Sequence, residues 1–245
     1  MKLVATIEAR MTSTRLPGKV LMPVLGRPML EFMVERVKRV PEIDQIVIAT
    51  TVNDTDQPIV DLAERLGVGC FQGSEHDVLG RVLLAAQAYE ADIITELTGD
   101  CPLIDPEVIS LIINRFHLED ADYVSNVPKR TYPIGMETQV FPTRVLGEVA
   151  AITNDPLDRE HVSRYIYHHT DSYRIVTVES GLPEKWHGFR LTLDTPEDYD
   201  LIRQVFEELY PNNPEFKLGD ILELLEGRPE LKLSGKITKG SPSSA

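Results

Sequence analysis

Cysteine is scarce in this sequence, and long apolar runs are missing. Cys70 and Cys101 are the only cysteines among 245 residues. Two thiols do not make the disulfide framework of a small secreted domain. A membrane-spanning helix needs roughly 20 consecutive apolar residues, and no run approaches that length. No charged segment followed by an apolar one opens the chain, as it does in a secretory leader. We therefore expect a cytoplasmic protein that does not enter a membrane.

Basic residues are also in short supply. The chain has 25 Lys and Arg against 39 Asp and Glu, which gives a formal net charge of −14. DNA or RNA would meet a repelling surface, so we expect no nucleic acid partner. A small anionic ligand needs only a local group of basic residues. Hydrophobic residues make up 42% of the chain, as in ordinary globular proteins, and the length is sufficient for one large α/β domain.

Short apolar segments alternate with amphipathic ones through the first half of the sequence. Apolar, partly β-branched runs predict strands at 3–7, 46–50, 68–71 and 92–97, and helical spacing predicts helices at 28–37, 59–66, 78–89 and 106–117. This alternation is typical of a Rossmann-like α/β fold, with a mostly parallel sheet and helices on both faces. Ligands of such sheets bind beyond the carboxyl ends of the strands. Here those are the segments after Ile7, Thr50 and Leu97.

The pattern changes after about residue 120. Strands are predicted at 123–125, 138–141, 173–178 and 189–193, and helices at 144–151, 159–168, 196–209 and 218–225. We interpret residues 1–235 as a single domain in which the segment at about 125–185 forms an inserted lobe or a dimerisation segment. The Ser-, Gly- and Lys-rich residues 236–245 are predicted to be a disordered tail.

The most informative segment is the loop of residues 9–19, Ala-Arg-Met-Thr-Ser-Thr-Arg-Leu-Pro-Gly-Lys, directly after the first strand. It places the cations Arg10, Arg15 and Lys19 in one short turn with hydroxyls, a glycine and consecutive backbone N–H groups. Guanidinium, ammonium and N–H groups together suit a triphosphate. The spacing is not that of a Walker loop. Taken alone, the loop is equally compatible with a solvated basic turn.

Two aspartates follow expected core strands. Asp100 comes after the strand at 92–97, and Asp194 after the strand at 189–193. Carboxylates at the carboxyl ends of strands can hold Mg²⁺, which prefers oxygen ligands and substrate phosphates. Each also has an ordinary interpretation. Asp100 can cap the turn before Pro102, and Asp194 can cap the helix that Pro196 opens.

Several motifs in order resemble the CMP-sugar synthetases. They are Arg10-x-x-Ser13-x-Arg15-Leu16-Pro17-Gly18-Lys19 with Gly26-Arg27-Pro28-Met29, then Asp77-Val78-Leu79-x-Arg81, Thr98-Gly99-Asp100-Cys101-Pro102-Leu103-Ile104-Asp105, Arg159-Glu160-His161-Val162 and Asp194-Thr195-Pro196-Glu197-Asp198. The resemblance covers about residues 3–205. It is strongest to the spore coat polysaccharide biosynthesis protein F family and extends to the CMP-KDO and CMP-acylneuraminate synthetases. It implies the GT-A-like fold of the nucleotide-diphospho-sugar transferases, with a small inserted lobe, and a homodimer.

The resemblance implies a cytidylyltransferase with Mg²⁺ as cofactor. Such an enzyme transfers CMP from CTP to a sugar or sugar acid and releases pyrophosphate, for a surface polysaccharide or another glycan. Two alternatives stay open. One is a nucleotidyltransferase for another base, or a glycosyltransferase, although Asp100-Cys101-Pro102 lacks the Asp-x-Asp metal motif of the latter. The other is a non-catalytic nucleotide-binding protein. Thr98 stands where CMP-KDO synthetases have a glutamine, which leaves the strictness of cytosine selection open.

The resemblance also implies roles for individual residues. The expected catalytic residues are Arg10, Lys19 and Asp100, and the expected metal ligands are Asp100 and Asp194. The expected nucleotide-binding residues are Ala9, Arg10, Ser13, Arg15, Gly18, Lys19, Asp77, Arg81 and Thr98. The expected acceptor-binding residues are Tyr132, Glu137, Arg159 and His161.

Overall fold

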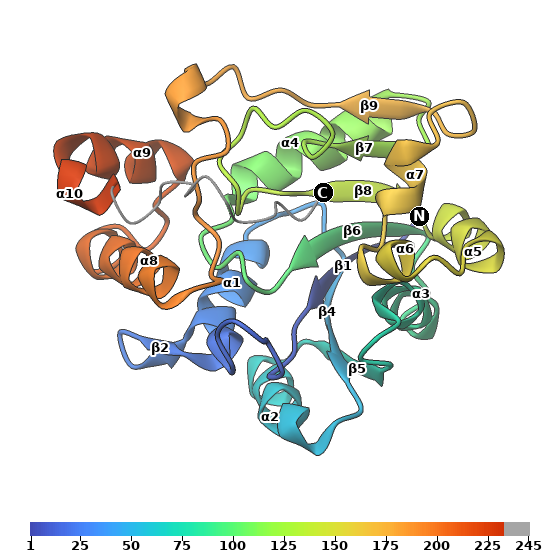
Figure 1. The fold of residues 1–245 in the computed structure, drawn as a ribbon, viewed down its shortest axis with the longest axis horizontal. Helices are drawn as coiled ribbons and strands as arrows, with labels where there is room; N and C mark the ends of the chain where they lie inside the picture. The colour runs from blue at the N-terminus through green and yellow to red at the C-terminus, as the bar shows by residue number, and fades with distance from the viewer. Residues whose placement is uncertain (233–245) are drawn as a thin grey trace.

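The computed structural model describes residues 1–232. The protein is built around a seven-stranded sheet (Figure 1). The predicted tail at 236–245 lies outside the described residues. The strands of the large sheet are β1 (Leu3–Glu8), β4 (Gln45–Thr51), β5 (Gly69–Gly73), β6 (Ile93–Thr98), β7 (Tyr123–Ser125), β8 (Gln139–Pro142) and β9 (Ile175–Thr177). A separate two-stranded ribbon consists of β2 (Pro23–Val24) and β3 (Arg27–Pro28).

Helices connect many of these strands, and the last three α-helices follow β9 in the chain. The α-helices are α1 (Met29–Val37), α2 (Gln57–Leu66), α3 (Val78–Ala88), α4 (Pro106–Leu118), α5 (Thr143–Ile152), α6 (Pro156–Glu160), α7 (Arg164–His168), α8 (Pro196–Leu209), α9 (Leu218–Gly227) and α10 (Pro229–Lys232). Three 3₁₀ turns are η1 (Lys19–Leu21), η2 (Asp54–Asp56) and η3 (Glu184–Trp186). Among the helices described, none is both long and apolar enough to span a bilayer.

Local chemistry sets where the helices begin and end. Asp105 caps α4, because its side chain accepts the backbone N–H of Glu107 at 2.8 Å and Pro106 occupies the first turn. Gly67 ends α2 in the left-handed conformation, with φ 63°, which glycine adopts without the steric cost of a side chain.

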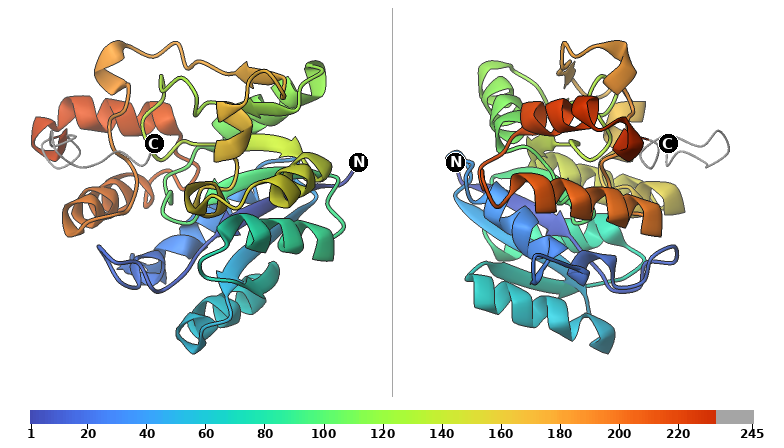
Figure 2. Two further views of the ribbon diagram at one scale, coloured as in Figure 1. Left: turned by 45° about the vertical axis from the view of Figure 1, so that its right-hand side comes forward. Right: turned by 90° about the vertical axis from the view of Figure 1, so that its left-hand side faces the viewer.

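Figure 2 shows α8 and α9, coloured orange to red, packed against each other at one end of the molecule.

The strand order is β5-β4-β1-β6-β8-β7-β9. The first four strands are parallel, β8 runs antiparallel to both β6 and β7, and β9 is parallel to β7. The predicted mixed, mostly parallel sheet with helices on both faces is therefore confirmed. Strands β8 and β9 come from the segment expected to form an inserted lobe, so part of that segment extends the central sheet.

Strand β1 is buried on both of its faces. Leu3, Ala5 and Ile7 pack into a core with α1, α4 and α8, and Val4 packs into a second core with α3 and α5. Residues at odd and even positions of a strand point to opposite faces, so both faces are covered, as a central parallel strand requires. Truncating Ile7 to alanine would cost about 2–5 kcal/mol, the usual range for a large-to-small change in a core.

Two predicted elements are wrong. The expected strand at 189–193 is irregular chain with one isolated bridge, between Ile134 and Arg190. Its backbone groups pair with two different loops, so no ladder forms. The expected helix at 159–168 is broken into α6 and α7, because Ser163 between them turns its hydroxyl toward Gln139 on β8 and Val162 is buried.

Candidate active site

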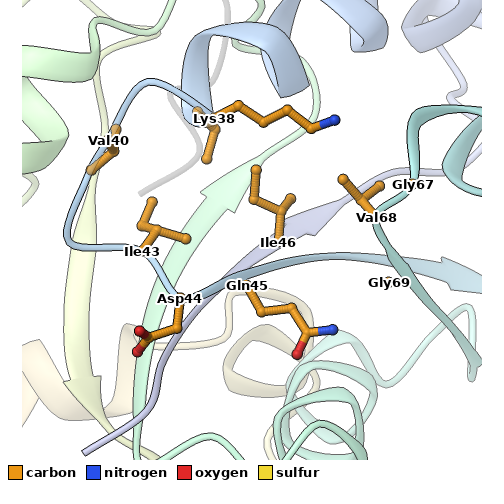
Figure 3. A pocket seen from close by; sticks show the side chains of 10 residues that line it. Lys38, Val40, Ile43, Asp44, Gln45, Ile46, Gly67, Val68 and Gly69 are labelled. Atoms are coloured by element: carbon orange, nitrogen blue, oxygen red, sulfur yellow. The ribbon is translucent and has the colours of Figure 1, made fainter.

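The expected site residues gather at the carboxyl edge of the parallel strands. The loop after β1, the turn after β4 and Asp100 after β6 all lie there. A cavity of about 240 Å³ lies at the opposite, amino edge and is shown in Figure 3. Its lining includes Ile43, Ile46 and Val68 and none of the expected site residues. The arrangement of charged groups at the carboxyl edge, not this cavity, identifies the candidate site.

Lys19 lies between two aspartates that are far apart in the sequence. Its Nζ is 2.8 Å from Oδ2 of Asp100 and 2.9 Å from Oδ1 of Asp194. Arg15 reaches the same Oδ1 of Asp194 at 3.0 Å, and Arg190 reaches Oδ2 at 2.8 Å. Sequence reasoning did not identify Arg190. The structure thus brings together the early cationic loop and both carboxylates that the resemblance assigned to a metal.

The opposite charges in this cluster stabilise one another. Burial alone lowers the pKa of Lys19, but the carboxylates of Asp100 and Asp194 outweigh it, so the pKa lies above its ordinary value. Burial alone raises the pKa of Asp194, but Lys19 and Arg190 outweigh it, so this pKa lies below its ordinary value. The ammonium and the carboxylate therefore both stay charged at neutral pH.

A tight turn presents Lys19 to the aspartates. Gly18 has a φ of 70°, and its N–H donates to the carbonyl of Met11 at 2.9 Å. A Cβ at Gly18 would also come within 3.2 Å of the Met11 side chain. Only glycine adopts this left-handed conformation without strain. Lys19 is the next residue and begins η1, so the turn at Gly18 sets the position of the Lys19 side chain.

Asp56, which sequence reasoning missed, anchors the other side of the loop. Its Oδ1 accepts the N–H of Met11 at 2.8 Å. Its Oδ2 accepts the hydroxyls of Thr50 and Thr51 at 2.9 and 2.6 Å, and the N–H of Thr51 at 3.1 Å. Burial favours a higher pKa for Asp56, but these hydrogen bonds hold the pKa below its ordinary value. A buried carboxylate thus ties the cationic loop to the end of β4.

The second aspartate is held beside the first by main-chain contacts. The N–H of Leu193 donates to the carbonyl of Asp100 at 2.7 Å, and the Thr192 hydroxyl reaches the same carbonyl at 3.2 Å. Oδ2 of Asp198 accepts the N–H of Asp194 at 3.1 Å. These contacts explain why residues 189–193 are not a strand: the segment crosses the end of β6 instead of pairing along it.

Asp194 is not the cap of the following helix. Thr195 occupies that position, and its hydroxyl accepts the N–H of Asp198 while Asp198 accepts the N–H of Thr195. This reciprocal capping box begins α8. The Asp194 side chain is therefore available for Lys19, Arg15 and Arg190.

Arg10 points toward the loop between β5 and α3. Its Nη1 donates to the carbonyl of Glu75 at 3.2 Å and lies 3.9 Å from that residue's carboxylate. The same carboxylate accepts the hydroxyl of Thr12 and, at 2.7 Å, the amide of Asn53. Ser13 is half-buried in the cationic loop. Glu75, another residue that the sequence did not reveal, docks the two loops on each other.

Comparison with known proteins agrees with the motifs. A protein-family model, that of the cytidylyltransferases, matches residues 4–221. The chain belongs to the cytidylyltransferase family. It is 32% identical over 231 residues to the spore coat polysaccharide biosynthesis protein SpsF of Bacillus subtilis, covering 91% of this chain and 94% of that protein. It is 34% identical over 232 residues to an uncharacterised protein of Methanocaldococcus jannaschii, covering 95% and 93%.

A solved structure resembles the chain over nearly its whole length. A cytidylyltransferase from Leptospira borgpetersenii superposes with a TM-score of 0.90 at 33% sequence identity, covering 97% of this chain and 99% of that one. The fold is therefore that of the nucleotide-diphospho-sugar transferases, as the resemblance implied.

Three of the four remaining residues that a cytidylyltransferase is expected to use for the nucleotide lie on the β4 and β5 side of the loop, namely Ala9, Asp77 and Arg81. Ala9 is buried, and its N–H donates to the sheet. Asp77 caps α3 through a backbone N–H of its first turn. Arg81 is buried and donates to the carbonyl of Ser74. Thr98 ends β6, on the opposite side of β1 from β4 and β5.

Among the expected acceptor residues, Glu137 is the one whose carboxyl interacts electrostatically with Asp100. Its carboxylate accepts the N–H of Gly135 at 2.5 Å and the guanidinium of Arg130 at 3.2 Å. Burial raises the pKa of Glu137 most, and the negative charge of Asp100 adds to that, while the two donors oppose it. The carboxyl is thus within electrostatic reach of Asp100.

The structure gives three other expected acceptor residues different surroundings. Tyr132 packs in the core and lines a separate cavity with Asp105. Arg159 donates at 3.0 Å to the carbonyl of Thr153 and also bonds the end of α5. His161 is half-buried at the break between α6 and α7. The contacts of Tyr132 and Arg159 are those of packing and positioning residues.

The two aspartates suit a metal that a nucleotide helps to hold. Both reach one nitrogen atom of Lys19 within 2.9 Å, so their oxygens converge on a cationic position. Over residues 1–232, no three His, Cys, Asp or Glu side chains gather as a complete metal site. Mg²⁺ is commonly held by one or two carboxylates, with phosphate oxygens and waters completing its shell. The donor set therefore fits a magnesium–nucleotide complex better than a structural metal.

Proposed function

We propose that this cytidylyltransferase uses Mg²⁺ and CTP to transfer CMP to a sugar or sugar acid, with release of pyrophosphate. The observation that supports the proposal most is the meeting of Lys19 with Asp100 and Asp194. The three groups come from three separate segments at the carboxyl edge of the sheet. A purely structural role for any one of these residues does not require all three side chains to lie in contact.

The cationic loop binds the triphosphate in this account. Lys19 and Arg15 are paired with aspartates here, and Arg10 is turned toward Glu75. Incoming phosphate oxygens exchange with these partners, so the three cations neutralise the charge that develops on the leaving pyrophosphate. Positioning and charge neutralisation supply most of the rate in phosphoryl transfer. Loss of Lys19 should cost roughly 3 kcal/mol or more of transition-state binding, as for a preorganised donor elsewhere.

Asp100 and Asp194 are the residues that would hold Mg²⁺. When bound, the ion neutralises phosphate charge and favours ionisation of the attacking hydroxyl. The protein fixes the two carboxylates through the bond from Leu193 to the Asp100 carbonyl and the bond from Asp194 to Asp198. Preorganised ligands of this kind need little rearrangement when the substrate arrives.

The acceptor sugar is proposed to lie between Asp100 and the loop that carries Glu137. The main-chain bridge between Ile134 and Arg190 places this loop beside the segment leading to Asp194. The Glu137 carboxyl can accept a hydrogen bond from a sugar hydroxyl, and the half-exposed Arg130 can meet a hydroxyl or a carboxylate.

We also propose a cytoplasmic homodimer that works in surface polysaccharide or glycan synthesis, including a spore coat route. The dimer contact would use the segment 125–185, where Ile152 and Leu157 are exposed large apolar side chains. The polysaccharide route is suggested by the name of the Bacillus subtilis relative. Light scattering at micromolar concentration tests the dimer. A mass near twice 27.6 kDa is expected, and a monomer would remove this part of the proposal.

One assay separates this function from its alternatives. The protein is incubated with each NTP, Mg²⁺ and a panel of sugars and sugar acids, and pyrophosphate is measured. Release with CTP alone is the expected result. Release with another nucleotide would make the enzyme a transferase for that base. A nucleotide-induced thermal shift without any release would indicate a binding protein.

A further inference from the structure

The two oxygens of the Asp194 carboxylate have partners from different parts of the fold. Oδ1 is 2.9 Å from Nζ of Lys19 and 3.0 Å from Nη2 of Arg15, both in the cationic loop. Oδ2 is 2.8 Å from Nη2 of Arg190, which lies only four residues earlier in the same segment. Oδ1 is therefore bonded to the loop that is proposed to bind phosphates, and Oδ2 is held by a local arginine.

Main-chain hydrogen bonds fix the backbone on both sides of Arg190. The N–H of Ile134 donates to the carbonyl of Phe189 at 2.8 Å, and the N–H of Leu191 donates to the carbonyl of Ile134 at 2.7 Å. A Cβ at Gly135 would come within 2.5 Å of the Leu191 carbonyl oxygen, so the two segments pack closely. The guanidinium of Arg190 thus extends from a backbone that has little room to move.

The guanidinium has a second anchor at the start of α8. The Nη2 atom that meets Asp194 is also 3.3 Å from Oδ2 of Asp198. Asp198 is buried, and its carboxylate accepts the N–H groups of Asp194 and Thr195 at 3.1 and 3.0 Å. One nitrogen of Arg190 therefore bridges a carboxylate of the site and a carboxylate that caps the helix. In its ordinary interpretation, Arg190 only stabilises this helix.

The two sets of partners respond differently to a nucleotide. Phosphates that take over Arg15 and Lys19, as in the proposed function, release Oδ1 of Asp194 but leave Oδ2 bonded to Arg190. Asp194 then offers a single oxygen to a cation. Mg²⁺ demands near-ideal octahedral geometry with phosphates and waters in its shell, whereas the larger Ca²⁺ accepts both oxygens of one carboxylate. An arginine on Oδ2 thus favours the smaller ion.

We propose that Arg190 is a positioning residue that makes Asp194 a one-oxygen ligand and thereby selects Mg²⁺ over Ca²⁺ in the nucleotide complex. The inference rests on the proposed function and deepens it, by assigning cation selectivity to a residue outside the two metal-binding aspartates. Arg190 acts through Asp194 and not on the nucleotide. Removing a hydrogen-bonding partner of a metal ligand commonly changes metal affinity or activity by about 10–100-fold, so the effect is measurable.

The test measures the dissociation constant of CTP by titration calorimetry in excess Mg²⁺ and in excess Ca²⁺, so that the nucleotide is fully complexed in each case. No acceptor sugar is added, so no turnover is needed. In the wild type we expect the Mg²⁺ complex of CTP to bind more tightly than the Ca²⁺ complex. In Arg190→Met, which has no donor for Oδ2 of Asp194, this preference should fall about tenfold, because Ca²⁺ gains the second oxygen. Circular dichroism establishes that each variant is folded.

Further variants separate positioning from stability. Arg190→Lys keeps a cation one bond short of Nη2 and should retain most of the Mg²⁺ preference. Arg190→Gln provides a second test of the loss, since its amide ends two bonds short of Nη2 but keeps a polar group in place of an apolar one. Arg203→Met is the control, because Arg203 also pairs with a carboxylate four residues later, that of Glu207 at 2.8 Å. Its loss should leave the preference unchanged.

The assignment fails if the wild type does not distinguish the two ions, or if folded Arg190→Met and Arg190→Gln keep the wild-type ratio. Lower melting temperatures with an unchanged ratio would make Arg190 a residue that only stabilises α8. Failure of the proposed function gives a different result. CTP would then bind the wild type equally well in EDTA, or would not bind at all, and the inference would fall with it.

Discussion

The backbone N–H of Leu193 donates a 2.7 Å hydrogen bond to the carbonyl oxygen of Asp100. This bond joins the end of β6 to the segment before α8, across more than ninety residues of sequence. It places the Asp194 side chain beside that of Asp100 before any ligand binds. The two carboxylates then share the ammonium of Lys19. The protein thus builds the site from main-chain contacts and uses its own cation to balance the charge.

Replacing Lys19 should expose the metal-binding capacity of the two aspartates. In Lys19→Met the side chain keeps most of its length but loses its charge, so Asp100 and Asp194 lack the cation between them. We expect pyrophosphate release to fall about 10²–10³-fold. We also expect millimolar Mg²⁺ without nucleotide to raise the melting temperature of this variant more than that of the wild type.

Lys129→Met is the matched control, because Lys129 is an exposed lysine paired with Glu179. It should respond to Mg²⁺ as the wild type does. Equal Mg²⁺-induced shifts in Lys19→Met and the wild type would argue against a shared cation position.

Asp56 should matter for both stability and nucleotide binding. Asp56→Asn places an amide N–H₂ group where the carboxylate accepts several donors, including the N–H of Met11. A lost buried acceptor costs about 1–3 kcal/mol. The loosened loop should raise the KM for CTP several-fold, measured by pyrophosphate release. Asp54→Asn, an exposed neighbour in η2, should change neither quantity.

The pH dependence of stability provides a second measurement on Asp56. Its pKa in the folded protein lies below the ordinary value. A depressed folded pKa contributes stability that is present above the unfolded pKa, about 4, and is lost as the pH falls through the folded value. Urea unfolding should therefore show that the wild type loses more stability than Asp56→Asn between neutral pH and the acid side of this range. Parallel losses would contradict the assignment.

Arg159 is expected to hold the fold, although the sequence resemblance assigned it to the acceptor. Its guanidinium donates to the carbonyls of Ala150 and Thr153 and lies 3.5 Å from Asp77. Arg159→Ala should lower the melting temperature, since hydrogen bonds from a charged group contribute about 1.5–3 kcal/mol each. The KM for the acceptor sugar should stay within about twofold, as one expects for a residue that only positions the fold.

Arg174→Ala provides the comparison for this variant, because Arg174 makes an exposed ion pair with Asp120 of little expected value. If Arg159→Ala kept the wild-type melting temperature but strongly raised the KM of the acceptor, the residue would touch the sugar after all.

Regular elements with local signals were predictable from the sequence. Helix α8 was predicted with its observed bounds, because Pro196 marks the first turn and acidic residues follow it. The segment at 189–193 has the alternating apolar residues of a strand, and Leu191 and Leu193 are indeed buried. Alternation reports which side chains face the core. It does not report where the backbone hydrogen bonds go, and here they go to two separate loops.

Only the site residues that belong to the recognised motifs were predictable from the sequence. Lys19, Asp100 and Asp194 were singled out by the resemblance, and the structure brings them together. Asp56 and Glu75 belong to no motif, because their contacts with the cationic loop depend on how β4 and β5 dock beside β1. Such long-range contacts leave no periodic trace in a single sequence.

The most direct measurement of the central claim is Mg²⁺-dependent pyrophosphate release from CTP by the wild type, Asp100→Asn and Asp194→Asn. Asp120→Asn, a change at a fully exposed carboxylate, serves as the control. Each active-site variant is expected to lose about 10²-fold or more of the turnover while circular dichroism shows it to be folded, and the control is expected to stay fully active. A folded Asp100→Asn protein that releases pyrophosphate at the normal rate would contradict the central claim.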